Sequence, residues 1–248
     1  MAKIKLNKVS TKAPKNWDKD ATKKKLAAIQ GELDELQNLL YAECKHSILV
    51  VIQGMDASGK DGLIRDVFGC MNPQGVQVTS FKVPTPEELS HDFLWRIHEH
   101  APAKGMIQVF NRSHYEDVLV TRVHKLIDDK TALKRLAAIN DFENLLATHN
   151  NTHVIKLYLH VSREEQLARL QERMKVPQKM WKYNAKDIEE SKLWDVYMGY
   201  YEEAFAKCNN PEWNIIPADQ NWYKSYLVAK LLRDALASFK MKYPGLKK

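Results

Sequence analysis

The sequence has few of the residues that build covalent frameworks. It contains three cysteines, Cys44, Cys70 and Cys208, which are far apart and odd in number. They indicate neither a disulfide framework nor a zinc site, and reduced thiols in a cytosolic protein are the simpler interpretation. No apolar run approaches the roughly 18 residues that suggest a membrane span. The basic N-terminal stretch is not followed by an apolar run either, so we expect no secretory signal.

Several catalytic signatures are also missing. The "HEH" triplet at 98–100 is not the H-E-x-x-H pair of a zinc protease, and His91 does not complete it. No G-x-S-x-G elbow nominates a nucleophilic serine. Internal repeats and low-complexity segments are absent as well. These absences exclude two common hydrolase classes and a repeat architecture.

The net charge of the chain narrows the classes of binding partner. Among 248 residues, 38 are Lys or Arg and 31 are Asp or Glu, a net charge of +7. This modest basic excess favours anionic partners, namely phosphates, nucleotides, nucleic acid or acidic lipid, without choosing among them. With 44% hydrophobic residues the chain can build a packed core of one large domain, with or without a lid-like insertion.

Short apolar runs alternate with amphipathic helical patterns along the chain. Such alternation predicts an α/β fold in which helices cover both faces of a parallel sheet. Ligands of such sheets bind beyond the carboxyl ends of the strands. The predicted strands are 47–53, 76–84, 105–111, 152–161 and 212–218, and the predicted helices are 20–45, 60–71, 85–102, 128–150, 162–176, 187–209 and 222–243, with Thr85 and Ser162 as N-caps and Glu165 completing a capping box.

The stretch "GMDASGKDG", Gly54–Gly62, joins a predicted strand to a predicted helix. It fits the G-x-x-x-x-G-K phosphate loop, in which backbone N–H groups converge on phosphate oxygens. The helix start adds partial positive charge and Lys60 adds a full one. This strand–loop–helix context makes a chance match improbable. A phosphate site at the end of the first strand is therefore the primary prediction.

One position departs from the standard loop. Asp61 follows the lysine, where a hydroxyl would normally ligate Mg²⁺. An acid there also repels phosphate, so the metal would depend on Asp56, which lies inside the loop. Asp61 then has two interpretations of similar weight. It is either a helix-start acid that favours the macrodipole or a group that faces the metal.

Two further motifs carry charge toward the same region. "NRSHYED", residues 111–117, follows the third predicted strand, and Arg112 can hold phosphate through two parallel hydrogen bonds. Glu116 and Asp117 place two carboxylates nearby. The alternative is an ordinary surface turn with ion pairs, and the phosphate loop favours the functional interpretation.

The third motif is a basic segment, residues 169–187. Arg169 and Arg173 lie four apart and share one face of a helix. A solvated basic face is the usual meaning of such a run, whereas the functional interpretation is a mobile lid that presents cations to a phosphate chain. The charge continues at Lys175, Lys179 and Lys182, with Trp181 between them.

Together these motifs resemble the polyphosphate kinase 2 family. The resemblance rests on "GMDASGKDG", "FKVPTPEELSHDFLWRIH", "NRSHYEDVLVTRVH", "MWKYNAKD" and "NIIPADQNWYKSYLVAKL", from about Gly54 to Leu231. It implies a P-loop kinase-like three-layer sandwich, similar in fold to thymidylate kinase, with a central five-stranded parallel sheet and a helical lid. It also implies phosphoryl transfer between inorganic polyphosphate and nucleotides with Mg²⁺, or Mn²⁺ in its place.

The resemblance implies how the chain is divided. Residues 1–248 form one polyphosphate kinase domain. An N-terminal arm and helix occupy 1–45, of which 1–20 are a loose or wrapping arm. The P-loop core occupies 46–161, the helical lid 162–192, and the C-terminal part of the core 193–248. Members are usually dimers or tetramers, so a homodimer or homotetramer is expected.

Site residues are carried over position by position. The resemblance makes Asp56, Lys60, Arg112 and Arg173 catalytic, with Asp56 as the metal ligand. The predicted nucleotide- and phosphate-binding residues are Gly54, Ala57, Ser58, Gly59, Asp61, Lys82, Asn111, Glu116, Arg122, Arg169 and Lys182.

One departure refines the predicted substrate. Many members that use diphosphates carry Asp before the Arg-Ser of the second motif, whereas this chain has Asn111, followed by Glu116. The combination resembles the subgroup that accepts both AMP and ADP. We therefore expect a cytoplasmic enzyme that uses polyphosphate and adenine, or also guanine, nucleotides and binds neither nucleic acid nor membrane. The alternatives are an ATP-dependent nucleoside monophosphate kinase and a non-catalytic nucleotide- or nucleic-acid-binding protein.

Overall fold

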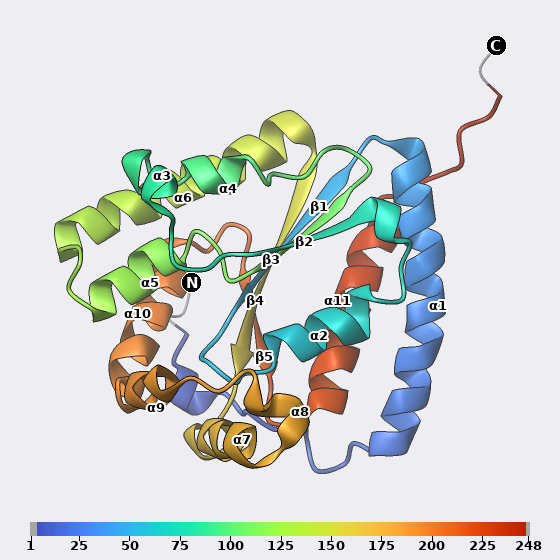
Figure 1. Ribbon diagram of the computed structural model, residues 1–248. Coiled ribbons are helices and arrows are strands. Elements are labelled where there is room, and N and C mark those ends of the chain that lie inside the picture. The colour runs from blue at the N-terminus through green and yellow to red at the C-terminus, as the bar shows by residue number, and fades with distance from the viewer. Residues whose placement is uncertain (1–3, 247–248) are drawn as a thin grey trace.

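A central sheet organises the computed structural model, which describes residues 4–246 (Figure 1). Its five strands are all parallel and lie in the order β2-β3-β1-β4-β5. The predicted α/β class and the five-stranded parallel sheet are confirmed. The strands are β1 (Ser47–Gln53), β2 (Val76–Ser80), β3 (Ile107–Asn111), β4 (Thr152–His160) and β5 (Trp213–Pro217).

The central strands are apolar because both of their faces are covered. Every residue of β1 is buried, and so is nearly every residue of β4, as expected of a parallel sheet between two helical layers. The edge strand β2 is partly exposed. This gradient of burial explains why the apolar runs of the sequence located the inner strands well.

Helices cover both faces of the sheet, as Figure 1 shows. On one side lie α1 (Lys19–Glu43), α2 (Lys60–Phe68) and α11 (Asn221–Ser238), with α1 and α11 packed along each other. The other side carries α5 (Glu116–Val123), α6 (Asp129–Asn150) and α10 (Trp194–Lys207). Asp18 caps α1 and Asp128 caps α6, each accepting a hydrogen bond from the first turn.

The sheet order creates an opening at the carboxyl ends of β1 and β3. The chain leaves β1 through α2 on one face and leaves β3 through α5 and α6 on the other face. Neighbouring parallel strands whose connections diverge in this way leave a crevice, which is where ligands of open α/β sheets bind. Ile52 is paired with Asn111 in this register, so the first two motifs meet there.

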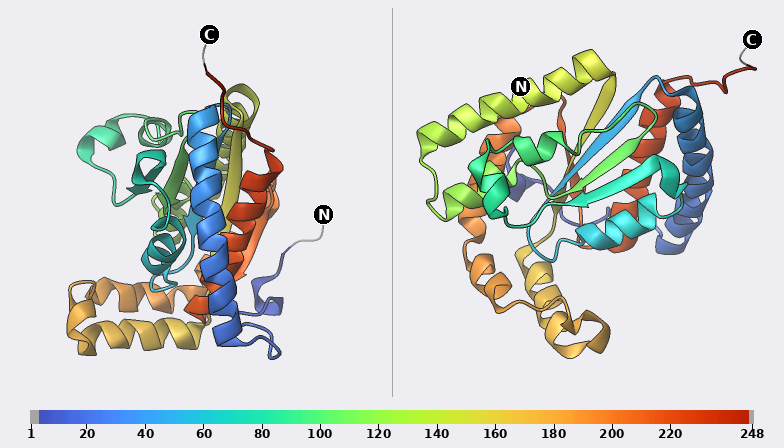
Figure 2. Two further views of the ribbon diagram at one scale, coloured as in Figure 1. Left: turned by 90° about the vertical axis from the view of Figure 1, so that its right-hand side faces the viewer. Right: turned by 45° about the horizontal axis from the view of Figure 1, so that its top comes forward.

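A separate helical segment projects beyond this end of the sheet. It comprises α7 (Arg163–Lys175), α8 (Pro177–Met180) and α9 (Ala185–Lys192). The left view of Figure 2 shows it extending away from the main body below the strands. Its position is that of the helical lid expected at 162–192, although the function of a lid and these domain boundaries stay predictions.

Two predicted helices are each divided in two. The one expected over 85–102 is α3 (Pro86–Ser90) and α4 (Trp95–His98). His91 is extended between them, and the Asp92 carboxylate accepts the N–H of Leu94 just before α4 begins. The helix expected over 187–209 is α9 and α10, interrupted at Leu193. Side-chain capping and local backbone geometry override the apolar periodicity at these breaks.

The predicted caps are present, with one correction. Thr85 forms a full capping box with Glu88. Ser162 accepts the N–H of Glu165, but the box is not completed, because the Glu165 carboxylate accepts from Arg169 instead. The backbone N–H of Ser162 donates to Asp219, so a contact from a distant loop replaces the local one.

The N-terminal arm wraps the lower part of the molecule. It contains the 3₁₀ turn η1 (Leu6–Lys8), and a second such turn, η2 (Pro73–Gly75), precedes β2. Leu6 is buried and its N–H donates to Glu202 on α10. Thr11 bonds Asp219 through both its side chain and its backbone. Of the two readings of this arm, the wrapping one fits residues 4–18, and 1–3 lie outside the described residues. Within 4–246, no helix combines the length and apolar character needed to cross a bilayer.

Candidate functional site

The predicted phosphate loop lies between β1 and α2, with three residues at positive φ. These are Gly54 at 151°, Ala57 at 61° and Gly59 at 91°. A Cβ on Gly54 would lie 2.9 Å from both the Leu159 carbonyl oxygen and Ser58 Oγ. One on Gly59 would approach the Lys224 ammonium to 2.4 Å. Both glycines are therefore required by conformation, and Gly54 is required by space as well, because a Cβ there would meet the backbone of Leu159.

Lys60 lies beneath this loop and is only 9% exposed. Its ammonium donates to the carbonyl oxygens of Gly54, at 2.8 Å, and Met55, at 3.1 Å. Burial and the nearby Arg112 cation lower its pKa to about 8, against the opposing charge of Asp56. The lysine is thus hydrogen-bonded by neutral acceptors, while the carboxylates of Asp56, Glu116 and Asp61 act on its charge from nearby.

The second motif meets the loop through an ion pair. Arg112 follows β3 at a φ of 61°, a conformation that is uncommon for a non-glycine residue. Its guanidinium donates to the Asp56 carboxylate. Both residues line a cavity of about 130 Å³ together with Glu116. Burial raises the pKa of Glu116, although Arg112 and Lys60 oppose the shift. The remaining lining residues are Gly54, Met55, Val120, His124, Glu190, Tyr197 and Tyr201.

Asp61 connects three segments of the site. Its carboxylate accepts from Asn111 at the end of β3, at 3.0 Å, and from Lys182 in the lid, at 2.6 Å. Burial alone would raise the pKa of Asp61, but these two hydrogen bonds outweigh it and hold the pKa below its usual range. Asp61 also lies in the first turn of α2. The helix-start interpretation therefore fits, and the bond to the lid is an addition that sequence reasoning missed.

The two lid arginines make different contacts. Arg169 donates to the carbonyl oxygens of Ala57, at 3.1 Å, and of Ala218 and Asp219, at 2.8 and 2.9 Å. Arg173 is paired with Asp187 at 2.7 Å, within the lid. Burial and the proximity of Asp56 raise the pKa of Asp187, against the effect of Arg173. The lid therefore brings an additional carboxylate close to the loop.

Two of the residues nominated from the sequence are paired with partners outside the loop, and a third is exposed. Arg122 bonds Asp129 and Glu203, and its guanidinium lies 4.0 Å from the ring centre of Tyr200. Lys82 is exposed just after β2. Asp117 follows Glu116 along the chain, but its carboxylate is paired with Arg96 at 3.3 Å and does not line the cavity with Glu116. The phosphate-binding roles of Arg122 and Lys82 stay predictions, and neither residue lines the cavity at the loop.

Three contributors were not nominated from the sequence. Gln166 is fully buried and donates to the Asp56 carbonyl oxygen. The sequence around Asp187 gave no sign of a functional role, because acidic residues are common in the first turn of a helix. Lys224 did have a signal in the sequence. It begins a row of buried residues at a spacing of four on α11, which continues with Val228, Leu232 and Leu236. A lysine in an apolar stripe is unusual and identifies a buried cation.

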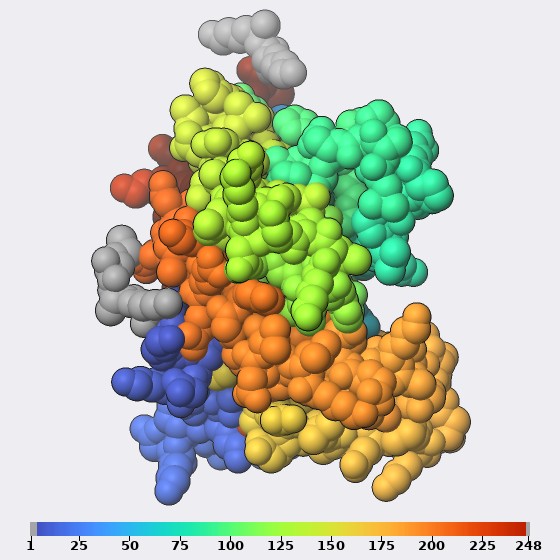
Figure 3. All heavy atoms as spheres, turned by 90° about the vertical axis from the view of Figure 1, so that its left-hand side faces the viewer, coloured from blue at the N-terminus to red at the C-terminus, as the bar shows by residue number. Residues whose placement is uncertain are grey.

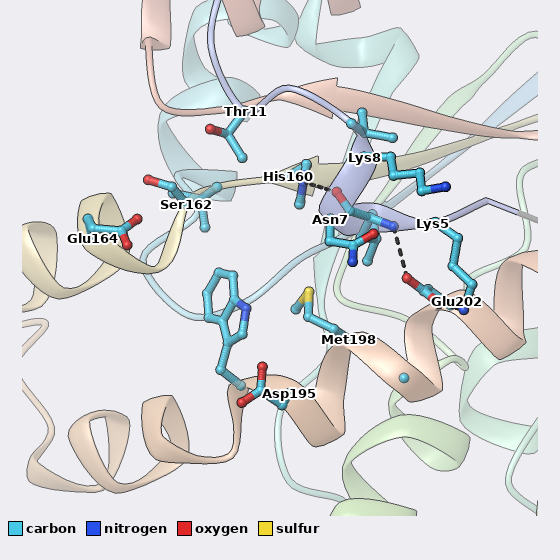
Figure 4. Close-up of a pocket in the computed structure, with 15 residues that line it drawn as sticks. Lys5, Asn7, Lys8, Thr11, His160, Ser162, Glu164, Asp195, Met198 and Glu202 are labelled. Atoms are coloured by element: carbon cyan, nitrogen blue, oxygen red, sulfur yellow. Dashed lines mark hydrogen bonds and ion pairs between the residues drawn. The ribbon is translucent and has the colours of Figure 1, made fainter.

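A larger cavity lies apart from the loop. Its volume is about 870 Å³, and it lies between the N-terminal arm, the end of β4 and α10. In Figure 4 His160 and Lys8 lie on one side of it and Met198 and Asp195 on the other. None of the predicted site residues lines it. The space-filling view in Figure 3 shows a different hollow, between the α3 segment and the lid.

The comparisons with known proteins agree with one another. The family model for polyphosphate kinase 2 matches residues 16–244. An AMP/ADP-polyphosphate phosphotransferase from Meiothermus ruber is 47% identical over 228 residues, which are 91% of this chain and 85% of the relative. An ADP-polyphosphate phosphotransferase from Rhodopseudomonas palustris is 40% identical, over 98% of this chain and 89% of the relative.

A solved structure matches almost the whole fold. The crystal structure of polyphosphate kinase 2 from Arthrobacter aurescens superimposes with a TM-score of 0.94 at 42% identity. The match covers 99% of this chain and 89% of that chain. The likeness thus extends through the sheet, both helical layers and the lid segment.

Proposed function

The chain belongs to the polyphosphate kinase 2 family, and we propose that it transfers phosphoryl groups between inorganic polyphosphate and AMP or ADP, forming ADP and ATP reversibly. The observation that carries this proposal is the extensive identity to a relative named for both acceptors. The arrangement of Lys60, Asp56 and Arg112 around the phosphate loop supports it. The enzyme is a phosphotransferase.

The reaction needs little covalent help from the protein. The acceptor is a terminal phosphate oxygen, and because the second pKa of such a group is about 6, it is already largely deprotonated at neutral pH. No general base is therefore required. The protein has to align the acceptor oxygen with the donor phosphorus and balance the charge on the transferring oxygens. Direct in-line transfer without a covalent enzyme intermediate satisfies both needs.

In this proposal each cation has a distinct task. Loop N–H groups and Lys60 hold one phosphate chain, and Arg112 contacts the transferring group from the end of β3. Arg173 and Lys182 approach from the lid after exchanging Asp187 and Asp61 for phosphate oxygens. Lid closure also excludes water, which would compete as acceptor. A polyanionic donor accounts for the number of cations deployed beyond the loop.

The residues present fit a magnesium ion held mainly by substrate. Residues 4–246 contain no cluster of three or more His, Cys, Asp or Glu side chains that could form a protein cage. Mg²⁺ commonly binds through one or two carboxylates plus substrate phosphates. Asp56 lines the cavity at the loop and is the proposed ligand. When bound, Mg²⁺, or Mn²⁺ in its place, would neutralise negative charge on the phosphate oxygens.

The remaining expectations concern partners and location. Adenine nucleotides are the proposed acceptors, and one relative, 30% identical, is named as a putative GDP-polyphosphate phosphotransferase. Guanine nucleotides are therefore included as candidate acceptors. A homodimer or homotetramer, a cytoplasmic location and the absence of nucleic-acid binding stay predictions.

The donor assay tests the proposal. AMP and long-chain polyphosphate are incubated with Mg²⁺ and without ATP, and nucleotides are separated by chromatography. We expect ADP first and ATP later, and the same assay started with ADP should give ATP. ADP formation that requires ATP would instead identify an ATP-dependent monophosphate kinase. Nucleotide binding without turnover from either donor would identify a sensor.

A further inference from the structure

The carbonyl groups of the phosphate loop are bound by side chains that come from several elements. A carbonyl oxygen carries partial negative charge and would repel a phosphate. Donors that hold these oxygens leave the N–H groups of the loop and of the first turn of α2 to face an anion. The donors are Lys60 for Gly54 and Met55, Gln166 for Asp56, Arg169 for Ala57, and Lys224 for Gly59.

Lys224 is the most buried cation of this group, at 1% exposure. It comes from the first turn of α11, and its ammonium donates to the Gly59 carbonyl oxygen at 2.9 Å and to Asn221 Oδ1 at 2.8 Å. The ammonium also occupies the space that a Cβ on residue 59 would need. Lys224 and Gly59 are therefore matched, because only glycine leaves room for this contact.

The surroundings of this side chain disfavour its charged form. Burial and the neighbouring Arg169 lower the pKa of Lys224 to about 7, against the effect of Asp66, and Lys60 adds further repulsion. Asp66 itself accepts a hydrogen bond from Ser225. An apolar side chain of similar volume at such a site is often neutral or stabilising. The cost indicates that the lysine serves the loop more than the fold.

We propose that Lys224 is a positioning residue for phosphoryl transfer, which holds the Gly59 carbonyl and so fixes the loop N–H groups in the arrangement that receives phosphate. The proposal rests on the proposed function of the same site. Lys224 makes no contact with substrate in this account. It acts through Gly59, at the backbone conformation that separates the loop from α2.

The test compares three variants and one matched control of the 248-residue chain. Lys224→Met keeps the length and removes the donor, so we expect kcat/KM for polyphosphate to fall by about 10², as for other preorganised donors. Lys224→Gln restores a donor without charge and should recover part of that loss. Asn221→Ala, which leaves the ammonium in place, should have a smaller effect than Lys224→Met. Lys230→Met, on an exposed lysine of the same helix, is the matched control and should behave as wild type.

A structural role would give a different pattern. If Lys224 served only packing, the variants would lose thermal stability and activity together. We expect the melting temperature of Lys224→Met to stay level or rise while activity falls. Should Lys224→Met fail to fold, Lys224→Gln carries the test. A folded variant with wild-type kcat/KM for polyphosphate would overturn the proposal.

A binding measurement separates this inference from the proposed function. Inorganic tripolyphosphate is titrated into wild type and Lys224→Met by calorimetry, without nucleotide. Weaker binding by the variant supports the positioning role even if wild type proved inactive with AMP and polyphosphate. Equal binding, or no binding by wild type, would overturn it. An active wild type with an unaffected variant would overturn the inference alone.

Discussion

The cations of the loop and the cations of the lid are held in opposite ways. Lys60 and Lys224 donate to backbone carbonyl oxygens of the loop, and those acceptors are neutral. Arg173 and Lys182, in the lid, are paired with the carboxylates of Asp187 and Asp61. These two buried lysines therefore keep their donors in a fixed geometry on neutral acceptors, whereas Arg173 and Lys182 are held in ion pairs that phosphate oxygens can replace.

The loop donors are thus preorganised before substrate binds, whereas the lid cations have to exchange a carboxylate for phosphate. Fixed donors in a largely buried loop need no rearrangement when substrate arrives, which is where electrostatic catalysis gains most. Lid ion pairs are partly exposed, and such pairs contribute little to stability. A ligand that offers several phosphate oxygens can displace them at modest cost. We infer that loop residues govern the rate of transfer and that lid residues govern capture of the polyanion.

Removal of the central loop cation should have the largest effect. Lys60→Ala takes away the charge that reaches the loop, and we expect kcat to fall on the order of 10³. Circular dichroism and thermal unfolding should remain those of a folded protein, because a buried cation costs stability. Near wild-type turnover in a folded Lys60→Ala enzyme would contradict the role of Lys60 in holding phosphate at the loop.

Replacement of Arg173 in the lid should have the second largest effect on activity. Arg173→Ala removes a cation that approaches only after it leaves Asp187, and we expect kcat/KM for polyphosphate to fall about 10². Lys175→Ala, on an exposed residue of the same helix, is the control and should stay within a few-fold of wild type. Equal losses in both variants would mean that general basic charge, and not Arg173, carries the effect.

The pH dependence distinguishes the loop from the lid in the unmodified enzyme. Burial lowers the pKa of Lys60 to about 8, so the group is charged below pH 8 and neutral above it. Since kcat/KM reports the free enzyme, it should fall up to about tenfold per pH unit above pH 8. A lid arginine stays protonated throughout this range. A flat profile from pH 7 to 9.5 would contradict the role given to Lys60.

Replacement of Asp61 should have the smallest effect and the opposite sign. Asp61→Ser releases Lys182 for phosphate, so KM for polyphosphate should fall about fivefold, the equivalent of roughly 1 kcal/mol for an exposed pair. The Mg²⁺ concentration needed for half-maximal rate should not change. A tenfold rise in that concentration would show that Asp61 faces the metal, and would favour the other interpretation of this residue.

The sequence predicted those features that are local along the chain. Apolar runs located the strands, and Gly54–Lys60 is a contiguous motif whose strand and helix neighbours were recognisable. The helix breaks at His91 and Leu193 were missed, because single side-chain and backbone contacts decide them. Periodicity averages over several turns and does not register one such position.

The site was predictable only in part for a related reason. The donors behind the loop come from α7 and α11, far away in the sequence, so no spacing rule connects Gln166 to Asp56 or Lys224 to Gly59. The bond between Asp61 and Lys182 likewise spans more than a hundred residues. The family resemblance identified the cationic residues of the loop and the lid, whereas the partners of those residues depend on the fold.

Phosphorus NMR of the complete reaction shows whether the phosphoryl group passes directly from polyphosphate to AMP. Wild type is mixed with AMP, Mg²⁺ and long-chain polyphosphate in the absence of ATP, and the spectrum is followed over time. We expect growth of the ADP β-phosphate resonance as internal polyphosphate signal is lost, without matching release of inorganic phosphate. A spectrum in which AMP persists unchanged, or in which polyphosphate is only hydrolysed, would contradict this transfer.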